Sequence, residues 1–316
     1  MTDTTTSIAS ITRDLAWAIN SAEPCALPGI LPWQEHGDWF SEWLQGPQPF
    51  TVESLASWRD RRLGKYFEAL WQCYLNAHPD WTLRLSHHPV YVARQTIGEL
   101  DFVLENRHTH ALWHLELAVK FFLYMPEPGM PCTSVLPSAN ELKHWVGPSL
   151  QDSLARKYHH LMHQQLPLGQ HPSIASTLMH RPDQSHAVVK GRFFVPADPQ
   201  WPSAQPQWMT WKEAQQLPPT CEVWPLSRGE WLTGTQDSAY STDQSLPCAD
   251  WLRSLAGPTV PAPQPRMLQL REEPGGERVW RFLVPDSWPD RARAMINQCD
   301  PITGQVRPSG NSMENS

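Results

Sequence analysis

The sequence predicts an α/β fold, and three observations lead to that prediction. A long stripe of apolar residues at helical spacing covers residues 51–77, and a short alternating strand follows at residues 81–85. Residues 96–105 and 111–123 read as two further strands, joined by a polar connection of hairpin length. Another helical pattern then leads to an apolar strand at residues 187–196. The predicted order is therefore helix, three strands, helix, strand.

The chain before this core begins with a predicted helix. Four apolar residues recur at helical spacing within residues 7–20, namely Ile8, Ile11, Leu15 and Ile19. Pro24 and Pro28 end this helix, because proline lacks the backbone N–H that a helix interior needs. Thr51 is a good N-cap for the long helix that follows. We therefore expect residues 1–50 to form an N-terminal helical segment.

The core is expected to span residues 51–200. Its second helix begins near Ser149, a natural N-cap that follows a proline, and Asp152 stands at the capping-box position. Pro167 is expected to stop that helix. The strand at the end of the core then completes the predicted order.

The chain beyond the core carries weaker signals and is expected to be a mixed C-terminal extension, residues 201–300. Gly275 and Gly276 separate two short alternating stretches, which predicts a hairpin. The other expected elements are a short helix, one or two strands and a linker, at residues 208–216, 221–232 and 257–265. The polar residues 301–316 are expected to be a disordered tail.

Composition narrows the functional class. The net charge of −7 argues against a protein that coats nucleic acid through bulk electrostatics, although a local nucleic-acid site stays open. The most apolar stretch, residues 111–125, is shorter than the roughly 20 residues of a membrane span. The polar N-terminus lacks the pattern of a secretory signal, and the 6 cysteines form no C-x-x-C pair. We therefore expect a cytoplasmic protein with free thiols and no membrane partner.

The predicted hairpin sorts its side chains onto two faces. A turn centred between His108 and Thr109 places Asp101 opposite Glu116. Because side chains alternate with period two, one face is entirely apolar: Leu100, Phe102, Leu104, Leu115, Leu117, Val119 and Phe121. The other face holds Glu99, Asp101, Val103, His114, Glu116, Ala118 and Lys120. A slip of one residue would mix both faces, so the pattern supports this register.

Three carboxylates on one face need a physical explanation. Directly opposed side chains have Cβ atoms about 5 Å apart, where like charges repel. Asp101 and Glu116 would destabilise the hairpin unless a cation joins them or one carboxyl stays protonated. Converging oxygens at that spacing suit Mg²⁺ or Mn²⁺, which polarise a phosphate. The equally weighted alternative is a solvated sheet face on which Lys120 balances the acids.

Two other clusters carry weaker signals. The second helix bears a basic set that either faces phosphate or, as we favour, is solvated: Arg156, Lys157, His159, His160 and His163. An H-x-H…H-x-E run along the hairpin would suit Zn²⁺, through His108, His110, His114 and Glu116.

The element order resembles the PD-(D/E)XK nuclease superfamily. The sequence G-E-L-D at residues 98–101 lies on one strand, and an acid and a lysine lie on the next. More narrowly, the whole chain resembles a family of uncharacterised bacterial proteins described only as a domain of unknown function and grouped with that superfamily by fold-level similarity. The resemblance implies a restriction-endonuclease-like core and metal-dependent hydrolysis of phosphodiester bonds.

The resemblance also assigns roles to residues. It matches Asp101 to the acid of the first half of the motif and Glu116 to the acid of the second half. It makes Lys120 the candidate for the lysine that orients or activates water, and Glu68 the accessory carboxylate of the long helix. We expect Asp101, Glu116 and Glu99 to hold Mg²⁺ or Mn²⁺.

The chain departs from the motif in one spacing. In the superfamily the acid and the lysine stand two positions apart on one strand, about 6.6 Å at strand rise. Here Glu116 and Lys120 stand four positions apart, with Ala118 between them on the same face. A β-bulge would close the gap. We favour the alternative that Glu99, expected opposite Ala118, supplies the missing carboxylate, because it needs only the register that the apolar face already sets.

Two functional classes follow from these observations. The first is a nuclease-like phosphodiester hydrolase that acts on DNA or RNA with Mg²⁺ or Mn²⁺. The second is a catalytically silent interaction protein that keeps the nuclease fold. The sequence names no protein partner for either class.

Overall fold

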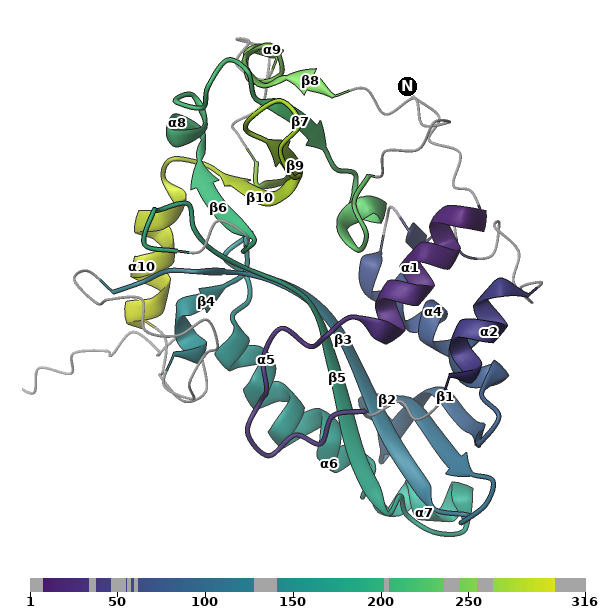
Figure 1. The fold of residues 1–316 in the computed structure, drawn as a ribbon. Helices are drawn as coiled ribbons and strands as arrows, with labels where there is room; N and C mark the ends of the chain where they lie inside the picture. The colour runs from purple at the N-terminus through teal and green to yellow at the C-terminus, as the bar shows by residue number, and fades with distance from the viewer. Residues whose placement is uncertain are drawn as a thin grey trace, which may run out of the picture.

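The computed structural model describes residues 8–33, 38–46, 55, 58–59, 62–127, 141–201, 205–235, 245–254 and 264–298. Within these residues the strands form one mixed sheet in the order β1-β2-β3-β5-β6-β10-β9-β7-β8, and β4 pairs with β3 (Figure 1). The fold is therefore mixed α/β, with helices against both faces of the sheet.

The first half of the sheet carries the predicted meander. Its strands are β1 (Trp81–Val92), β2 (Gln95–Asn106), β3 (Leu112–Tyr124) and β5 (Gln184–Pro196). The pairs β1–β2 and β2–β3 are antiparallel, and β5 runs parallel to β3. β1 continues well past the predicted residues 81–85, through Pro89. As the end strand of the sheet, β1 tolerates a proline that a central strand would not.

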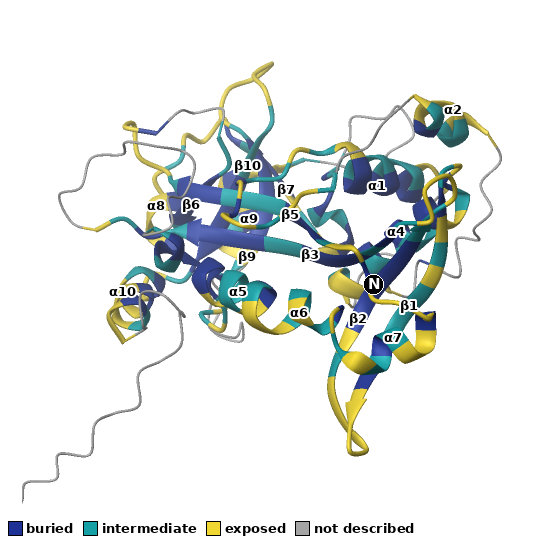
Figure 2. Cartoon of the chain, turned by 90° about the horizontal axis from the view of Figure 1, so that it is seen from below, coloured by how far each residue is buried: buried dark blue, intermediate teal, exposed yellow. Residues whose placement is uncertain are grey.

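Helices cover the two faces of this half-sheet. One face carries α1 (Ile8–Asn20), α2 (Trp39–Gln45) and α4 (Leu63–Ala77). The other carries α5 (Leu154–His160), the π-helical turn Leu161–Gln165, α6 (Leu166–Leu168) and α7 (Pro172–Leu178). Figures 1 and 2 show the sheet running between these two groups, with its central strands largely buried.

The apolar stripe of α4 explains why this helix docks on the sheet. Its buried residues are Tyr66, Phe67, Leu70, Trp71, Tyr74 and Leu75, and they join one core cluster with Phe102, Leu104 and Leu115 of the hairpin. Each large apolar side chain buried in this way contributes roughly 1.5–3 kcal/mol. The predicted N-cap Thr51 lies outside the described residues, but Leu55, Trp58 and Arg59 are helical.

The start of the second core helix differs from the prediction. α5 begins at Leu154, and its N-cap is Ser153, whose hydroxyl accepts a hydrogen bond from the Arg156 N–H. The predicted cap Ser149 lies in a turn, where Leu150 has a φ of 60° that no helix allows. Pro167 lies in α6, which directly continues the π-helical turn and ends at Leu168, one residue beyond the predicted stop.

The C-terminal extension continues the same sheet. β6 (Gln207–Thr210) is parallel to β5 and to β10 (Val279–Val284), and β10 is antiparallel to β9 (Arg266–Arg271). The predicted Gly275–Gly276 hairpin is thus confirmed. The predicted helix at residues 208–216 is wrong in its first part, which belongs to β6; only α8 (Trp211–Ala214) is helical, with Thr210 as its cap.

Several short elements complete the described chain. They are β4 (Trp145–Val146), β7 (Glu222–Pro225), β8 (Leu246–Pro247), α9 (Cys248–Ser254), α10 (Trp288–Gln298) and 3₁₀ turns at Leu142–His144 and Arg228–Trp231. Most of the predicted linker and the whole predicted tail lie outside the described residues. Among described residues the thiols of Cys25, Cys73, Cys221 and Cys248 are free, as predicted. None of the described helices has the length and apolarity to cross a membrane.

Candidate functional site

The site lies where β2 and β3 separate. The two strands pair from Glu105–Leu112 to Phe102–Leu115, in the predicted register, and beyond that point β2 leaves β3, whereas β3 stays paired with β5 on its other edge from Trp113 to Leu123. Where the backbone hydrogen bonds between β2 and β3 stop, two hydrogen bonds between a side chain and a backbone N–H connect the strands. Oδ2 of Asp101 accepts a 2.8 Å hydrogen bond from the Leu117 N–H, and Oε1 of Glu116 accepts one of 3.4 Å from the Asp101 N–H. Asp101 and Glu116 are therefore held at the fork between the strands.

Glu116 is fully buried, so the solvated-face interpretation of this acid is wrong. Nε2 of His114, which is also fully buried, lies 2.8 Å from Oε1 of Glu116. The amide Nε2 of Gln165 donates to Oε2 of the same carboxylate. Both oxygens of Glu116 thus have hydrogen-bond partners, and one of these partners is a neutral amide from the helical layer. Such partners fix the orientation of a buried carboxylate.

The helical layer packs tightly on this network. Gly169 closes α6, and a Cβ at its position would lie 2.7 Å from Nδ1 of His114. The backbone therefore approaches the imidazole more closely than any larger residue allows. Ser185 of β5 stands 3.5 Å from the same Nδ1. His114 is thus confined between two elements while it holds Glu116.

Asp101 and Lys157 have displaced pKa values. Burial, and then the charge of Glu116, raise the pKa of Asp101 to about 8. Burial, and then the charge of Lys120, lower the pKa of Lys157 to about 8, while Glu116 and Asp101 act in the opposite sense. The charges of Asp101 and Lys157 thus act on each other across the site. Opposed shifts of this kind are typical of functional sites.

A second group of ligand atoms converges on Asp101 from the α4 side. One ligand atom from each of Glu68, His87 and Asp101 lies within 4.8 Å of the other two. Nδ1 of His87 is buried without a hydrogen-bond partner among the described residues, 3.4 Å from Oε2 of Glu68. The backbone of His87 has a φ of 48°, an uncommon conformation for a residue other than glycine. This nitrogen also lies 3.7 Å from Oε1 of Glu99, so it stands close to two carboxylates.

Glu99 is placed differently from the prediction. The expected pairs Glu99–Ala118 and Ile97–Lys120 are not formed by these described residues, because β2 and β3 have already separated. Glu99 lies opposite Pro89 of β1, and its carboxylate lies 3.5 Å from Nζ of Lys65. It is therefore a half-exposed neighbour of the Glu68 group, whereas Glu68 reaches Asp101 from α4.

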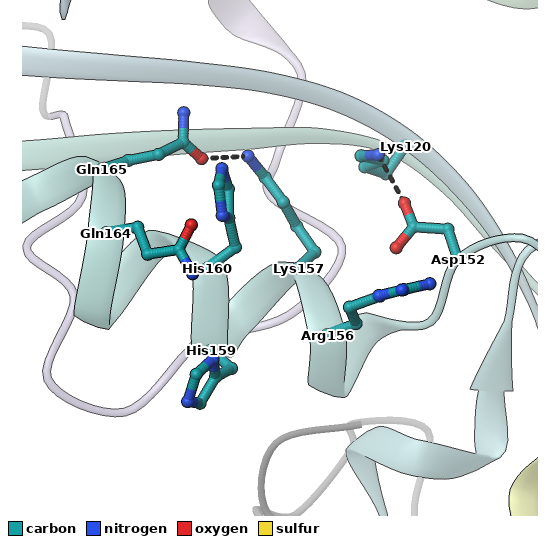
Figure 3. Close-up of a pocket in the computed structure, with 8 residues that line it drawn as sticks. All are labelled: Lys120, Asp152, Arg156, Lys157, His159, His160, Gln164 and Gln165. Carbon is teal, nitrogen blue, oxygen red and sulfur yellow. Dashed lines mark hydrogen bonds and ion pairs between the residues drawn. The ribbon is translucent and has the colours of Figure 1, made fainter. Parts of the chain in front are cut away.

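Lys120 also faces a partner that the sequence did not suggest. Its Nζ donates a 2.5 Å hydrogen bond to Oδ2 of Asp152, the residue that precedes the true N-cap of α5 (Figure 3). The structure instead brings Lys157 of α5 toward the acids. Nζ of Lys157 donates to Oε1 of Gln165 at 2.8 Å, and Gln165 in turn binds Glu116. Gln165 is thus a site residue that sequence reasoning missed, as it also missed His87, whereas Lys157 was named only within a basic set for which a solvated helix side was favoured.

The predicted zinc set does not assemble. His108 and His110 are exposed at the hairpin turn, where they contact Asp80 and Glu105. His114, in contrast, is committed to Glu116. The basic set of α5 divides in a similar way: Lys157 is half-buried beside the acids, whereas Arg156 and His160 are exposed.

The chain belongs to the family described as "Domain of unknown function (DUF1853)", whose model matches residues 13–282. The match covers most of the chain, including every residue of the site. No curated protein and no solved structure matches the chain significantly.

Proposed function

We propose that this member of the DUF1853 family is a divalent-metal-dependent phosphodiester hydrolase that acts on nucleic acid. One observation carries the proposal: two buried carboxylates, Asp101 and Glu116, meet at the fork between β2 and β3. A helix carboxylate, Glu68, approaches from one side, and a lysine, Lys157, acts on them from the other. Acids that converge on a cation beside a lysine suit the hydrolysis of a phosphate ester.

The fold supports a PD-(D/E)XK-like interpretation of the core. Helix α4 precedes the antiparallel meander β1-β2-β3, α5 follows it, and β5 returns parallel to β3. This is the helix, three strands, helix, strand order on which the resemblance rests. The acids stand on β2 and β3, the two strands to which the motif assigns them.

The residues present fit a divalent cation. Asp101 and Glu68 offer carboxylate oxygens, and His87 offers a buried nitrogen that the described residues leave without a hydrogen bond. Burial, and then the charge of Glu116, raise the pKa of Asp101 to about 8, and a bound cation would offset both effects. Carboxylates suit Mg²⁺ and Mn²⁺, and the imidazole favours Mn²⁺ of the two. When bound, the ion would supply Lewis-acid polarisation of the phosphate and a more acidic water.

The chain's own residues have distinct tasks in this proposal. His114 and Gln165 hold Glu116 in one orientation, so its carboxylate is fixed before substrate arrives. Lys157 sits one hydrogen-bonded amide away from Glu116, where its ammonium would stabilise the negative charge that develops on phosphate oxygens. The pKa of Lys157, lowered to about 8, also lets it exchange a proton near neutral pH.

The direct test is a cleavage panel. Purified protein would be incubated with single-stranded, double-stranded and branched DNA and with RNA, with Mg²⁺ or Mn²⁺ and after chelation by EDTA. We expect metal-dependent cleavage of at least one substrate, and its loss in Asp101→Asn and Glu116→Gln. Asp290→Asn, an exposed α10 residue, is the matched control and should retain activity. Cleavage that survives Asp101→Asn, or absence of cleavage throughout the panel, would contradict the hydrolase and favour the silent interaction protein.

A further inference from the structure

A pocket opens beside the acids, between β3 and the helical layer. It has a volume of about 450 Å³, within the range of small-molecule sites. Its walls come from Lys120 of β3 and from residues 152–165 around α5 (Figure 3). The lining side chains are Lys120, Asp152, Arg156, Lys157, His159, His160, Gln164 and Gln165.

The charge of this lining is one-sided. Five of the lining side chains are basic types, whereas Asp152 is the one carboxylate among them. Asp152 is already paired with Lys120. Lys157 has one hydrogen-bond acceptor among the described residues, the amide of Gln165, although an ammonium offers three donors. Arg156 is exposed, and one of its terminal nitrogens donates a hydrogen bond to the backbone carbonyl of Gln151. The pocket therefore offers several donors to an anion.

The partial burial of Lys157 gives a physical reason why this pocket would favour an anion. Burial and the charge of Lys120 both disfavour its protonated form. A bound anion would offset both effects, whereas a neutral ligand would add to the first. Groups with several charge-accepting oxygens, such as phosphates, match lysine and arginine donors best.

The place of the pocket links it to the acids. Gln165 lines the pocket and binds both partners: its carbonyl oxygen accepts from Lys157, and its amide donates to Glu116. One side chain thus separates the anion pocket from the carboxylate site. A nucleic-acid strand that presented one phosphate to the acids would bring a neighbouring phosphate close to these basic side chains.

We propose that this pocket binds the phosphate group of the nucleotide next to the bond that is cleaved, with Arg156 and Lys157 as its principal donors. The inference rests on the proposed function for its biological meaning, but the binding itself needs no metal. The phosphate has two sources, a strand end or the interior of a strand. Both sources offer the same phosphate oxygens, so the pocket alone does not distinguish them, and the second test below does.

The first test measures binding in EDTA, where hydrolysis cannot contribute. Calorimetric titration would compare thymidine 5′-monophosphate with thymidine. We expect the monophosphate to bind and thymidine to fail, and Arg156→Gln to weaken the monophosphate at least about tenfold. Arg253→Gln, an exposed α9 residue, is the matched control and should leave binding unchanged. Equal binding of both compounds, no binding of the monophosphate, or full retention in Arg156→Gln would overturn the proposal.

The second test identifies the source of the phosphate. Anisotropy in EDTA would compare a 5′-phosphorylated strand, the same strand with a 5′-hydroxyl, and its circular form. Loss of affinity without the 5′-phosphate assigns the pocket to strand ends, whereas equal affinity for all three assigns it to internal phosphates. In either case Lys157→Gln should weaken binding; affinity unchanged by both Lys157→Gln and Arg156→Gln would contradict the pocket. Binding with no cleavage in the metal panel would reject the hydrolase and keep the pocket.

Discussion

The backbone N–H of Asp101 lies 3.4 Å from Oε1 of Glu116, so these residues meet through a main-chain donor and a side chain where a ladder pair would otherwise form. Glu116 thereby gains a donor that an opposed carboxylate could not offer. Asp101 gains the Leu117 N–H at 2.8 Å. These two hydrogen bonds keep the acids close despite their charge, but they do not remove the cost of burying them, and the pKa of Asp101 stays raised.

The first prediction concerns stability against pH. Because the folded pKa of Asp101, about 8, lies above the unfolded value near 3.9, unfolding releases a proton between those values. Stability contributed by this group is therefore lost as pH rises from about 4 to about 8. Asp101→Asn, which keeps the neutral form, should melt at a higher temperature than the native protein, by a margin that grows from pH 5 to pH 8. Thermal melts in EDTA check this.

The same variant should respond differently to metal. The native protein is expected to gain melting temperature with Mn²⁺, since a ligand that binds only the folded state stabilises it. Asp101→Asn should lose that gain, and Asp290→Asn should keep it. Identical melting curves for all three proteins, with and without Mn²⁺, would show that Asp101 bears no uncompensated charge.

The second prediction tests the packing of His114. Gly169→Ala would place a Cβ 2.7 Å from Nδ1 of His114, and the overpacking should cost about 1–3 kcal/mol of unfolding free energy. Gly64→Ala is the matched control, because it lies in α4 with no atom within 4 Å of the added Cβ. That change should be neutral or stabilising by up to about 1 kcal/mol. Urea denaturation of both variants measures the difference, and an equal effect would show that the His114 contact is relaxed in solution.

The third prediction concerns Lys65, whose ammonium group already pairs with Glu68. Nζ of Lys65 lies 2.7 Å from Oε2 of Glu68, and the pKa of Lys65 is raised: burial lowers it, but Glu68, Glu99 and Asp101 outweigh that effect. A divalent ion at these carboxylates must compete with this ammonium. Lys65→Met should therefore increase Mn²⁺ affinity, by about threefold or more even after solvent screening.

Calorimetric titration of Mn²⁺ provides the measurement for Lys65. The control is Lys212→Met, an exposed lysine of α8. Weaker Mn²⁺ binding in Lys65→Met would mean that the lysine supports the site instead of competing for it.

The sequence predicted the hairpin and its register because the alternation of apolar residues leaves little freedom. Phe102 does pair with Leu115, as the apolar face required. The separation of the strands beyond that pair leaves no trace in periodicity, so Glu99 was placed across from β3 when it in fact pairs with β1. His87 was missed because the predicted strand stopped at residue 85, whereas β1 continues past His87 and through Pro89, a proline that its place at the end of the sheet permits.

The two lysines show which features of the site local sequence patterns cannot predict. Lys120 is on the predicted face, and its distance along the strand was known, but its partner Asp152 comes from a turn that was predicted as helix. Lys157 belongs to a basic helix whose charges normally face solvent. Its partial burial depends on how α5 and the π-helical turn cover β3, which is a tertiary property. Gln165 was missed for the same reason, since nothing in the sequence indicates that it bonds to both Lys157 and Glu116.

The final prediction separates the two lysines. If cleavage occurs, Lys157→Met should reduce kcat by about 100-fold or more, because its ammonium would act on charge that develops in the transition state. Lys120→Met should reduce kcat by about tenfold at most, since Nζ of Lys120 is engaged with Asp152 and reaches the acids only through its effect on Lys157. Both variants should retain Mn²⁺ binding, measured by calorimetry, because the proposed ligands are untouched.

The pH profile of kcat adds a measurement that a merely structural role would not change. Removing the positive charge of Lys120 should raise the pKa of Lys157 and shift the profile to higher pH. A larger loss in Lys120→Met than in Lys157→Met would return the catalytic role to the strand lysine that the motif implies.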